Sequence, residues 1–288
     1  MILVTGSAGK TGLAVIGELA FRGEAVRALI HKEAYREIVS ASGPKEIIQG
    51  DLLAPDRIKA ALKGIKAVYD ICPNVHPQEL EIGEIIIRTS RQVGVEHFVY
   101  HSVLHPQLEA LPHHWLKMRV EELLIESGLV FTILQPTVYM HNVIAQLKNI
   151  DNELIYQVPY SIETRLCLVD LFDIAQVAGI VITNPGHKGA VYELVGTEII
   201  SPIEVASEIS DQLGYTVPAV QISIEDWKRQ AEKEGLGKYQ ISTLIKMFNH
   251  YQKYGFPGNT NTLGWLLGRS PTSLADFIRT DIFAADQF

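Results

Sequence analysis

Short apolar runs alternate with amphipathic stretches through the first half of the chain. The runs, rich in Val, Ile and Leu, predict strands at residues 2–5, 25–30, 46–49, 67–71, 97–101 and 130–135. The stretches between them have helical periodicity and predict helices at residues 11–22, 55–62, 78–93 and 112–127. Such strands, separated by helices, are typical of a parallel sheet buried on both faces. The pattern therefore predicts an α/β fold with a doubly wound parallel sheet, whose ligands bind at the carboxyl ends of the strands.

Prolines and glycines mark several of the expected helix ends. Pro55 and Pro112 stand at first helical positions, where the missing N–H of proline is tolerated. Gly23 and Gly128 stand where a helix would end.

The pattern becomes irregular after Pro136. Residues 137–165 have no clear period, whereas later segments predict a helix near 169–175, a strand near 190–195 and a helix over 203–213 that Ser201 and Pro202 open. The tail from about residue 222 predicts further helices. We expect a first domain, which contains the parallel sheet, over residues 1–150, and the chain to return to it around 166–195. Residues 151–288 are expected to form a smaller C-terminal lobe that covers the substrate.

Composition and charge restrict the classes of partner. The chain is 47% hydrophobic and 20% charged, as in ordinary globular proteins, and its net charge of −8 disfavours nucleic-acid binding. No apolar run approaches the roughly 20 residues that cross a bilayer, and the start does not resemble a signal peptide. Two cysteines fit a reducing compartment. We expect a cytoplasmic monomer or homodimer that acts on a small molecule.

A glycine-rich loop follows the first strand and opens the first helix. Its residues are Gly6, Ser7, Ala8, Gly9, Lys10, Thr11 and Gly12. Glycines allow a tight turn and bring backbone N–H groups close to a pyrophosphate at the helix N-terminus. The strand before the loop and the helix after it support a dinucleotide site. A nucleotide-triphosphate P-loop is disfavoured, because its first glycine would fall at Val4.

The end of the second strand favours NADP(H) over NAD(H). An acidic residue there would bind the ribose 2′-hydroxyl of NAD, but the chain has His31 and Lys32, and its first acid is Glu33. Lys10 in the loop and Arg27 in the strand add positive charge, which suits a 2′-phosphate.

Three residues after the third and fourth strands complete the expected cofactor site. Asp51 and the adjacent Leu52 follow the third strand; Asp51 can accept a hydrogen bond from the adenine amino group or, alternatively, cap the helix that Pro55 opens. Cys72 follows the fourth strand and is expected near the cofactor, where burial as a small apolar residue is favoured over reactivity.

These motifs resemble the NmrA-like branch of the atypical short-chain dehydrogenase/reductase superfamily, whose members have a Rossmann fold. The matching segments are Thr5-Gly6-x-x-Gly9-x-x-Gly12, Gly50-Asp51-Leu52, His101-Ser102-Val103, Lys117, Gln135-Pro136-Thr137, Val169-Asp170-x-x-Asp173-Ile174-Ala175 and Leu266-Leu267-Gly268-Arg269-x-Pro271. The resemblance covers about residues 1 to 282 and implies an NAD(P)-binding protein, without specifying a substrate.

The resemblance also implies a catalytic lysine. In related reductases a Tyr-x-x-x-Lys helix supplies a proton-donating tyrosine and a lysine that holds the nicotinamide ribose. Lys117 matches that lysine, but His113 stands in the tyrosine position. Positions i and i+4 share a helix face, so both can act at one place. A histidine with a pKa near 6.5 can donate a proton, although Lys117 and an oxidised nicotinamide would favour its neutral form.

Other residues can contribute to the reaction. Ser102 matches the polar position after the fifth strand and can orient a carbonyl, and Tyr139 after the sixth strand is a substitute proton donor. Trp115, Met140 and Tyr160, like Tyr139, fit either a substrate pocket or a core.

Histidines are frequent between the fifth strand and the following helix, at positions 97, 101, 105, 113 and 114. We expect them to line the cofactor pocket and expect no metal, because zinc sites need three or four converging ligands.

Two functions follow from these residues. The first is an NADP(H)-dependent oxidoreductase that reduces a small apolar or aromatic carbonyl, enone or quinone. The second is a non-catalytic NADP(H)-sensing regulator that acts through a protein partner, as some NmrA-like proteins do. His113 in place of tyrosine keeps both interpretations open, because function depends on the site and not on the fold.

Overall fold

The computed structural model describes residues 1–150 and 153–282, which form two compact units. Unit 1 comprises Met1–Pro136 and Ile174–Glu193, and unit 2 comprises Thr137–Asp173 and Leu194–Phe288. The chain thus leaves unit 1 at Pro136, directly after a strand, whereas the sequence analysis placed this boundary at residue 150. The return to unit 1 falls within the expected stretch 166–195.

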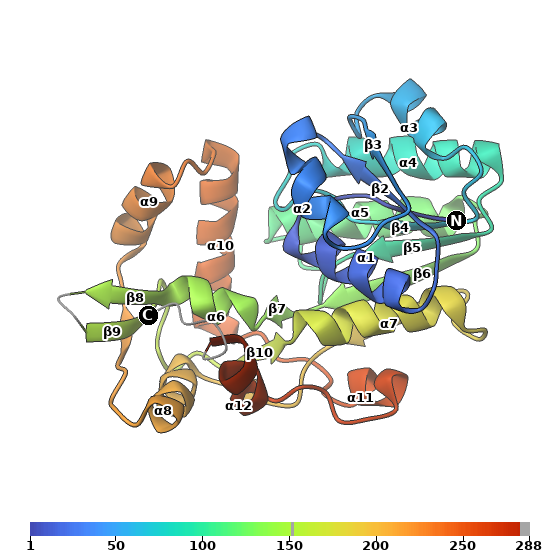
Figure 1. Ribbon diagram of the computed structural model, residues 1–288. Helices are drawn as coiled ribbons and strands as arrows, with labels where there is room; N and C mark the ends of the chain where they lie inside the picture. The colour runs from blue at the N-terminus through green and yellow to red at the C-terminus, as the bar shows by residue number, and fades with distance from the viewer. Residues whose placement is uncertain (151–152, 283–288) are drawn as a thin grey trace. The chain divides into compact units, whose positions relative to one another are not determined.

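Unit 1 is built on a seven-stranded sheet in the order β11-β6-β5-β4-β1-β2-β3 (Figure 1). The strands are β1 (Ile2–Val4), β2 (Val26–Ile30), β3 (Glu46–Gln49), β4 (Ala67–Asp70), β5 (His97–His101), β6 (Phe131–Pro136) and β11 (Ala190–Leu194). The pairs from β3 to β6 are parallel, and hydrogen bonds at both ends of β11 give it the same direction as β6. The predicted doubly wound α/β fold is confirmed.

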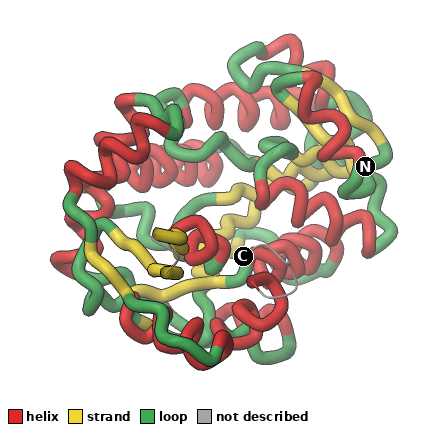
Figure 2. The backbone as a smooth tube through the Cα atoms, turned by 60° about the vertical axis from the view of Figure 1, so that its left-hand side comes forward, coloured by secondary structure: helices red, strands yellow, loops and turns green. Residues whose placement is uncertain are grey.

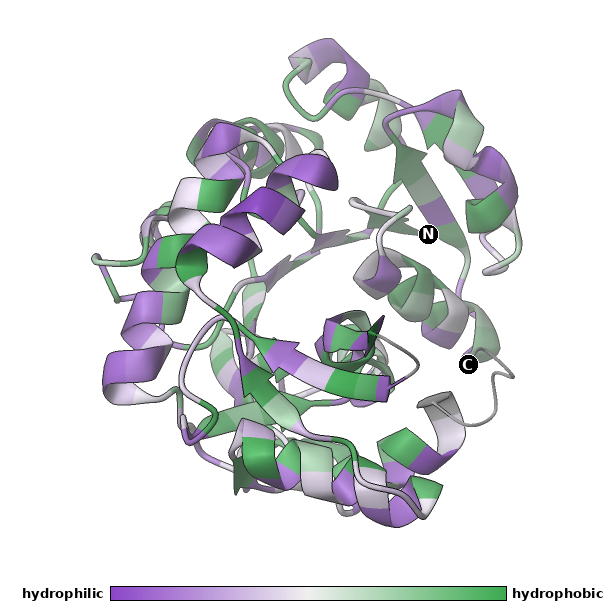
Figure 3. Cartoon of the chain, turned by 90° about the vertical axis from the view of Figure 1, so that its left-hand side faces the viewer, coloured by the Kyte–Doolittle hydropathy of each residue, from purple (hydrophilic) through white to green (hydrophobic). Residues whose placement is uncertain are grey.

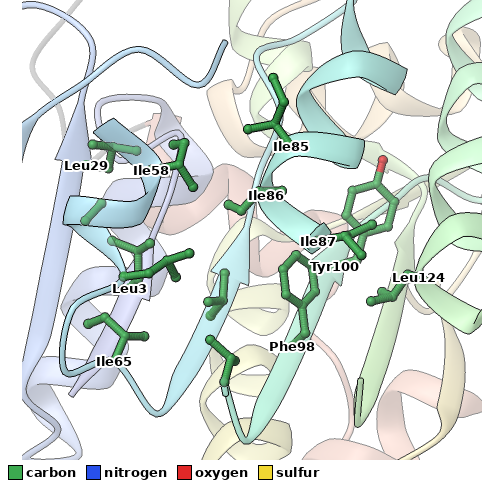
Figure 4. Close-up of a cluster of buried hydrophobic side chains, with 14 of the residues drawn as sticks. Leu3, Leu29, Ile58, Ile65, Ile85, Ile86, Ile87, Phe98, Tyr100 and Leu124 are labelled. Atoms are coloured by element: carbon green, nitrogen blue, oxygen red, sulfur yellow. The ribbon is translucent and has the colours of Figure 1, made fainter. Parts of the chain in front are cut away.

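Helices cover both faces of this sheet. They are α1 (Lys10–Phe21), α2 (Arg36–Ser40), α3 (Pro55–Ala61), α4 (Glu79–Val93), α5 (Pro112–Glu126) and α7 (Leu171–Thr183). Helices α3, α4 and α5 pack on one face over a buried cluster that includes Leu3, Ile86 and Phe98 (Figure 4). Helices α1 and α7 lie on the other face (Figure 1). The four helices predicted for residues 1–136 and their capping prolines are confirmed, and α2 was not predicted.

Unit 2 contains two three-stranded sheets, in the orders β12-β10-β7 and β13-β9-β8. Their strands are β7 (Val138–Tyr139), β8 (Leu147–Ile150), β9 (Glu153–Val158), β10 (Leu166–Val169), β12 (Ile199–Ile200) and β13 (Ala219–Gln221). The unit's helices are α6 (His141–Gln146), α8 (Pro202–Leu213), α9 (Ile224–Lys233), α10 (Lys238–Tyr254), α11 (Thr262–Leu267) and α12 (Leu274–Phe277). Figure 2 shows the strands in yellow and the helices in red.

The helices of the C-terminal half follow the predicted signals. Ser201 caps α8, because its hydroxyl accepts a hydrogen bond from the Glu204 N–H while the Glu204 carboxylate accepts one from the Ser201 N–H. Hydrophilic and hydrophobic residues alternate along the helices of both units, as expected for helices with one packed side (Figure 3). Over the described residues, no helix is long and apolar enough to cross a membrane.

Candidate functional site

The loop between β1 and α1 has the geometry of a tight turn. Gly6 has a φ of +57°, and the Ser7 hydroxyl closes the turn by donating to the Val4 carbonyl at 2.7 Å. Gly9 is the N-cap of α1 and has no side chain with which to cap the helix. The first turn of α1 contains no acidic residue. The helix N-terminus therefore presents backbone N–H groups and partial positive charge, which suit a phosphate.

Glycine is required at Gly12 and Gly6 by the fold but not at Gly9. A Cβ at Gly12 would lie 2.4 Å from the Gly6 carbonyl oxygen, and one at Gly6 would lie 2.8 Å from the Ile71 oxygen. A Cβ at Gly9 would meet only the Gly6 oxygen, at 3.4 Å, and Gly9 has an ordinary φ of −79°. An exposed position that could hold a side chain but has none fits the close approach of a pyrophosphate.

The residues expected near a 2′-phosphate are exposed and at the expected places. His31 and Lys32 directly follow β2, and Lys10 is the first residue of α1. Glu33, the nearest acid, is paired with Arg36 in two hydrogen bonds, which offsets its charge.

Arg27 does not add charge at this place, contrary to our expectation. Its guanidinium donates to Glu46 at 2.8 Å and to the carbonyl oxygens of Ala61 and Lys63, both at 2.7 Å. Arg27 therefore binds carbonyl oxygens at the C-terminal end of α3.

Asp51 and Leu52 lie after β3 as predicted, but Asp51 does not cap α3. The N-cap of that helix is Ala54, and the Asp51 carboxylate accepts a hydrogen bond from the Leu53 N–H at 2.9 Å. Asp51 is exposed and Leu52 is half-buried. The interpretation of Asp51 as a helix cap is wrong, and its role toward an adenine stays a prediction.

Asp70 and Cys72 lie at and just after the carboxyl end of β4. The Thr5 hydroxyl donates to the Asp70 carboxylate at 2.8 Å and joins the ends of β1 and β4. Burial raises the pKa of Asp70 to about 6. Cys72 is buried, and burial raises the pKa of its thiol, so it is not a reactive thiolate at neutral pH.

Lys117 is held by a buried carboxylate from the neighbouring helix. Its Nζ lies 2.5 Å from Oε1 of Glu79, the first residue of α4, and donates to the His101 carbonyl at 3.3 Å. The Tyr100 hydroxyl also donates to Glu79 Oε1, at 3.1 Å, and points away from the apolar cluster (Figure 4). Glu79 Oε2 is buried without a hydrogen-bond partner in the described part of the chain.

Ser102 contacts a second buried carboxylate. It lies just after β5, and its hydroxyl forms a short hydrogen bond with Oε1 of Glu121 on α5. The Gln135 side-chain amide, near the end of β6, donates to both Glu121 oxygens, at 2.9 and 3.0 Å. Burial raises the pKa of Glu121.

His113, Lys117 and Glu121 occupy positions i, i+4 and i+8 of α5, so one helix face carries all three. Burial and the nearby Lys117 lower the pKa of His113 to about 4, and its Nδ1 has no hydrogen-bond partner among the described residues. The imidazole is therefore neutral at neutral pH. As a proton donor His113 stays a prediction, and its neutral state disfavours that role.

The other histidines have structural partners. His97 Nε2 contacts the Thr132 hydroxyl, His101 Nδ1 contacts the Tyr69 hydroxyl, and His114 Nδ1 contacts the His105 carbonyl. Within residues 1–150 and 153–282, no three His, Cys, Asp or Glu side chains are arranged to hold a metal ion.

Tyr139 belongs to unit 2, where it pairs with Val169 in the β10-β7 ladder. It lines a small pocket of that unit together with Tyr160 and residues of α6, β9, β10 and α8. Met140 is buried in the same unit, and Trp115 of α5 is half-buried in unit 1. Tyr139 and Tyr160 are thus pocket residues.

Three carboxylates of the site were not predicted from the sequence: Asp70, Glu79 and Glu121. In each case the neighbouring residues in the sequence did not indicate a buried carboxylate. Asp70 ends an apolar strand, and the two glutamates occupy polar positions of amphipathic helices. The i+4 spacing from Lys117 to Glu121 was the one available signal.

Comparison with known proteins places the chain in a family. A model of the NmrA-like family matches residues 1–278. An NAD(P)H azoreductase from Xenophilus azovorans is 27% identical over 281 residues, 97% of each chain. Quinone oxidoreductase 2 from Escherichia coli is 25% identical over 280 residues, 96% of this chain and 97% of that protein.

Solved structures show the same similarity. The crystal structure of an NADPH-dependent quinone oxidoreductase from Escherichia coli, complexed with NADPH, has a TM-score of 0.82 at 25% identity and covers 97% of this chain and 99% of that one. NmrA, a negative transcriptional regulator, in complex with NADP has a TM-score of 0.82 at 19% identity, with coverage of 99% and 96%, which shows the shared fold. The chain belongs to the NmrA-like family, whose members are NAD(P)-binding Rossmann-type proteins.

Proposed function

We propose that this protein is an NADP(H)-dependent oxidoreductase that reduces a small aromatic or apolar acceptor with a conjugated carbonyl, such as a quinone. The observation that carries the proposal is the cluster of Lys117, Ser102 and their buried carboxylates in unit 1. This cluster lies at the carboxyl edge of the sheet whose first strand leads into the glycine loop. Ligands of doubly wound sheets bind at that edge.

Each part of the edge has a role in this proposal. The loop from Gly6 to Gly12 binds the pyrophosphate, and Lys117 holds the nicotinamide ribose. The bound dinucleotide supplies a hydride to the acceptor. Ser102 orients the acceptor's carbonyl oxygen. The relatives named as an azoreductase and a quinone oxidoreductase support reduction of conjugated acceptors, because both align over almost the whole chain.

The central experiment is anaerobic single-turnover oxidation of bound NADPH by a panel of quinones, enones and azo compounds. We expect at least one class of acceptor to oxidise NADPH, and Lys117→Met to slow that step by about 10² or more, the usual range for a group that acts on the reacting atoms. Arg119→Met, an exposed position on the same helix, serves as the matched control. Absence of oxidation by every acceptor would contradict the proposal.

We further propose that the cofactor is NADP(H) and not NAD(H). Lys10, His31 and Lys32 are exposed at the expected 2′-phosphate position, and Arg36 offsets the charge of Glu33. Fluorescence titration should give tighter binding of NADPH than of NADH. The double change Lys10→Gln and Lys32→Gln should reduce this difference, while Lys59→Gln, exposed on α3, should not. Tighter binding of NADH by the unchanged protein would refute the preference.

A second function, NADP(H) sensing without turnover, is supported by one observation. His113 replaces the proton-donating tyrosine and is neutral at neutral pH. In this case NADPH and NADP⁺ would bind with different affinities, and no acceptor would oxidise NADPH. The single-turnover experiment therefore separates the two functions.

A further inference from the structure

We propose that Glu121 stores the proton used in the reduction and passes it to the bound acceptor through the Ser102 hydroxyl. This inference rests on the proposed function and deepens it, because a hydride transfer to the carbonyl carbon, or to the carbon conjugated with it, leaves the carbonyl oxygen in need of a proton. The usual tyrosine is absent at position 113.

The contacts of Glu121 form a path that ends at Ser102. The Glu121 side chain is buried, with 4% of the residue exposed, and its Oε1 is in direct hydrogen-bond contact with Ser102 Oγ. Gln135 donates to both carboxyl oxygens and fixes the plane of the group. Ser102 is the first residue after β5, at the edge where the acceptor is expected. The hydroxyl thus contacts the carboxyl group directly, one residue past the end of β5.

Burial shifts Glu121 toward its protonated form. Within the described ranges it forms no ion pair, since the ammonium of Lys117, one turn away, is paired with Glu79 of α4. Burial raises the pKa of Glu121, and the hydrogen bonds from Ser102 and Gln135 and the charge of Lys117 lower it, with burial the largest effect. His113, one further turn along the same face, is neutral and adds no charge.

The other titratable groups near Lys117 have other hydrogen-bond partners or hold no imidazolium proton. Burial lowers the pKa of His113 to about 4, so it holds no imidazolium proton at neutral pH. Burial raises the pKa of the Tyr100 hydroxyl, which already donates to Glu79. Asp70 accepts the Thr5 hydroxyl at the base of the glycine loop. Glu121 is the carboxyl group in contact with a hydroxyl at the strand ends of β5 and β6.

The proton transfer balances with the hydride. The acceptor gains two electrons with the hydride, and its oxygen takes the proton of the Ser102 hydroxyl as a new O–H bond forms. At the same time the carboxyl O–H bond of Glu121 breaks and its proton moves to Ser102 Oγ, which restores the hydroxyl. Glu121 is left as a carboxylate that Gln135 and Ser102 stabilise by donating hydrogen bonds. It regains a proton from solvent before the next turnover.

The first test is the pH dependence of single-turnover reduction in Glu121→Gln, which keeps the shape and most hydrogen bonds of the side chain. We expect the rate to fall by about 10² or more and the decline of the wild-type rate with rising pH to disappear. Glu122→Gln, on the exposed side of the same helix, is the matched control and should keep the wild-type profile. Ser102→Ala should lose the same factor, with no further loss in the double variant.

A second measurement keeps the inference separate from the proposed function. Infrared difference spectra between wild type and Glu121→Gln should contain the carbonyl band of a protonated carboxylic acid, and this band should vanish as the pH rises. Absence of the band at the pH at which the reduction is measured overturns the proton store, whether or not any acceptor reacts. A wild-type rate and pH profile in Glu121→Gln, with an acceptor that reacts, overturns it as well. No reaction with any acceptor, with the band present, refutes the proposed function and the delivery step but not the stored proton.

Discussion

At the scale of single residues, Gly9 and Gly12 belong to one loop, but a methyl group at each position would meet different surroundings. At Gly12 it would collide with the backbone of Gly6 and Ser7, at 2.4 and 2.7 Å. At Gly9 it would enter the space in front of the helix N-terminus. Glycine at position 12 therefore serves the packing of α1 on the turn, and glycine at position 9 is available for a ligand.

These surroundings predict that the same substitution affects stability at one position and NADPH binding at the other. Gly12→Ala should destabilise the protein by about 1–3 kcal/mol, as other overpacked positions do, measured by chemical unfolding. Gly9→Ala should leave the free energy of unfolding nearly unchanged and weaken NADPH binding by about tenfold or more, because phosphate hydrogen bonds are lost. Unchanged NADPH affinity in Gly9→Ala would exclude close approach of the pyrophosphate.

Asp70 predicts a second residue-scale effect, on the pH dependence of stability. Its pKa is about 6 in the folded protein and near 3.9 in an unfolded chain, so the folded state holds the proton more tightly. The stabilisation from this group is complete below about pH 4 and is lost as the pH rises through about 6.

The measurement is the difference in free energy of unfolding between wild type and Asp70→Asn, followed with pH. Wild type should lose about 3 kcal/mol relative to the variant between about pH 4 and 7. Asp56→Asn, exposed in the first turn of α3, is the matched control. A constant difference across this range would mean that Asp70 does not titrate there.

At the scale of elements, much of unit 1 was predictable from the sequence. The six strands predicted for residues 1–136 and the four long helices end within one or two residues of the expected positions. They could be predicted because the strands of a doubly covered sheet are largely apolar runs, and because prolines and glycines mark several helix ends.

The segment 137–165 could not be predicted for a physical reason. Its elements are short, and β7 has only two residues, so no period can be established. β9 pairs with the neighbouring β8, but β7 pairs with β10 and β9 also pairs with β13, both outside this segment. The buried carboxylates could likewise not be predicted, because the residues that pair with them are distant in sequence. Glu79 contacts Lys117, and Glu121 contacts Ser102 and Gln135.

The cap of α8 gives an element-scale prediction. Ser201→Ala removes the hydroxyl that accepts the Glu204 N–H, so we expect a loss of about 1 kcal/mol in the free energy of unfolding. Ser207→Ala, exposed within the same helix, should be neutral or slightly stabilising because alanine is the better helix former. Equal effects at the two positions would show that the cap contributes nothing.

At the scale of the whole molecule, neither unit is a continuous piece of chain. Unit 1 needs residues 174–193, since α7 covers one face of its sheet and β11 forms the edge next to β6. A cut at one position therefore cannot separate the two units.

This arrangement predicts the behaviour of fragments. Residues 1–136 alone should lack a cooperative unfolding transition. Without β11 and α7, β6 has no partner on one side and one face of the sheet is partly exposed to solvent. Residues 1–136 joined to 174–193 by a flexible linker should recover a cooperative transition and bind NADPH. Circular dichroism during denaturation measures the unfolding transition, and fluorescence titration measures NADPH binding. Cooperative unfolding of residues 1–136 alone would show that α7 and β11 are dispensable.

The order of the segments along the chain also determines the order in which they leave the ribosome. β6 leaves the exit tunnel well before β11, because the first segment of unit 2 is synthesised between them. At rates of about 5–20 residues per second, the roughly 50 intervening residues keep the edge of β6 open for several seconds. Open strand edges are where nascent chains pair wrongly. The yield of active protein in cells should therefore depend on how fast translation proceeds between these two strands, and on chaperones that bind during that interval.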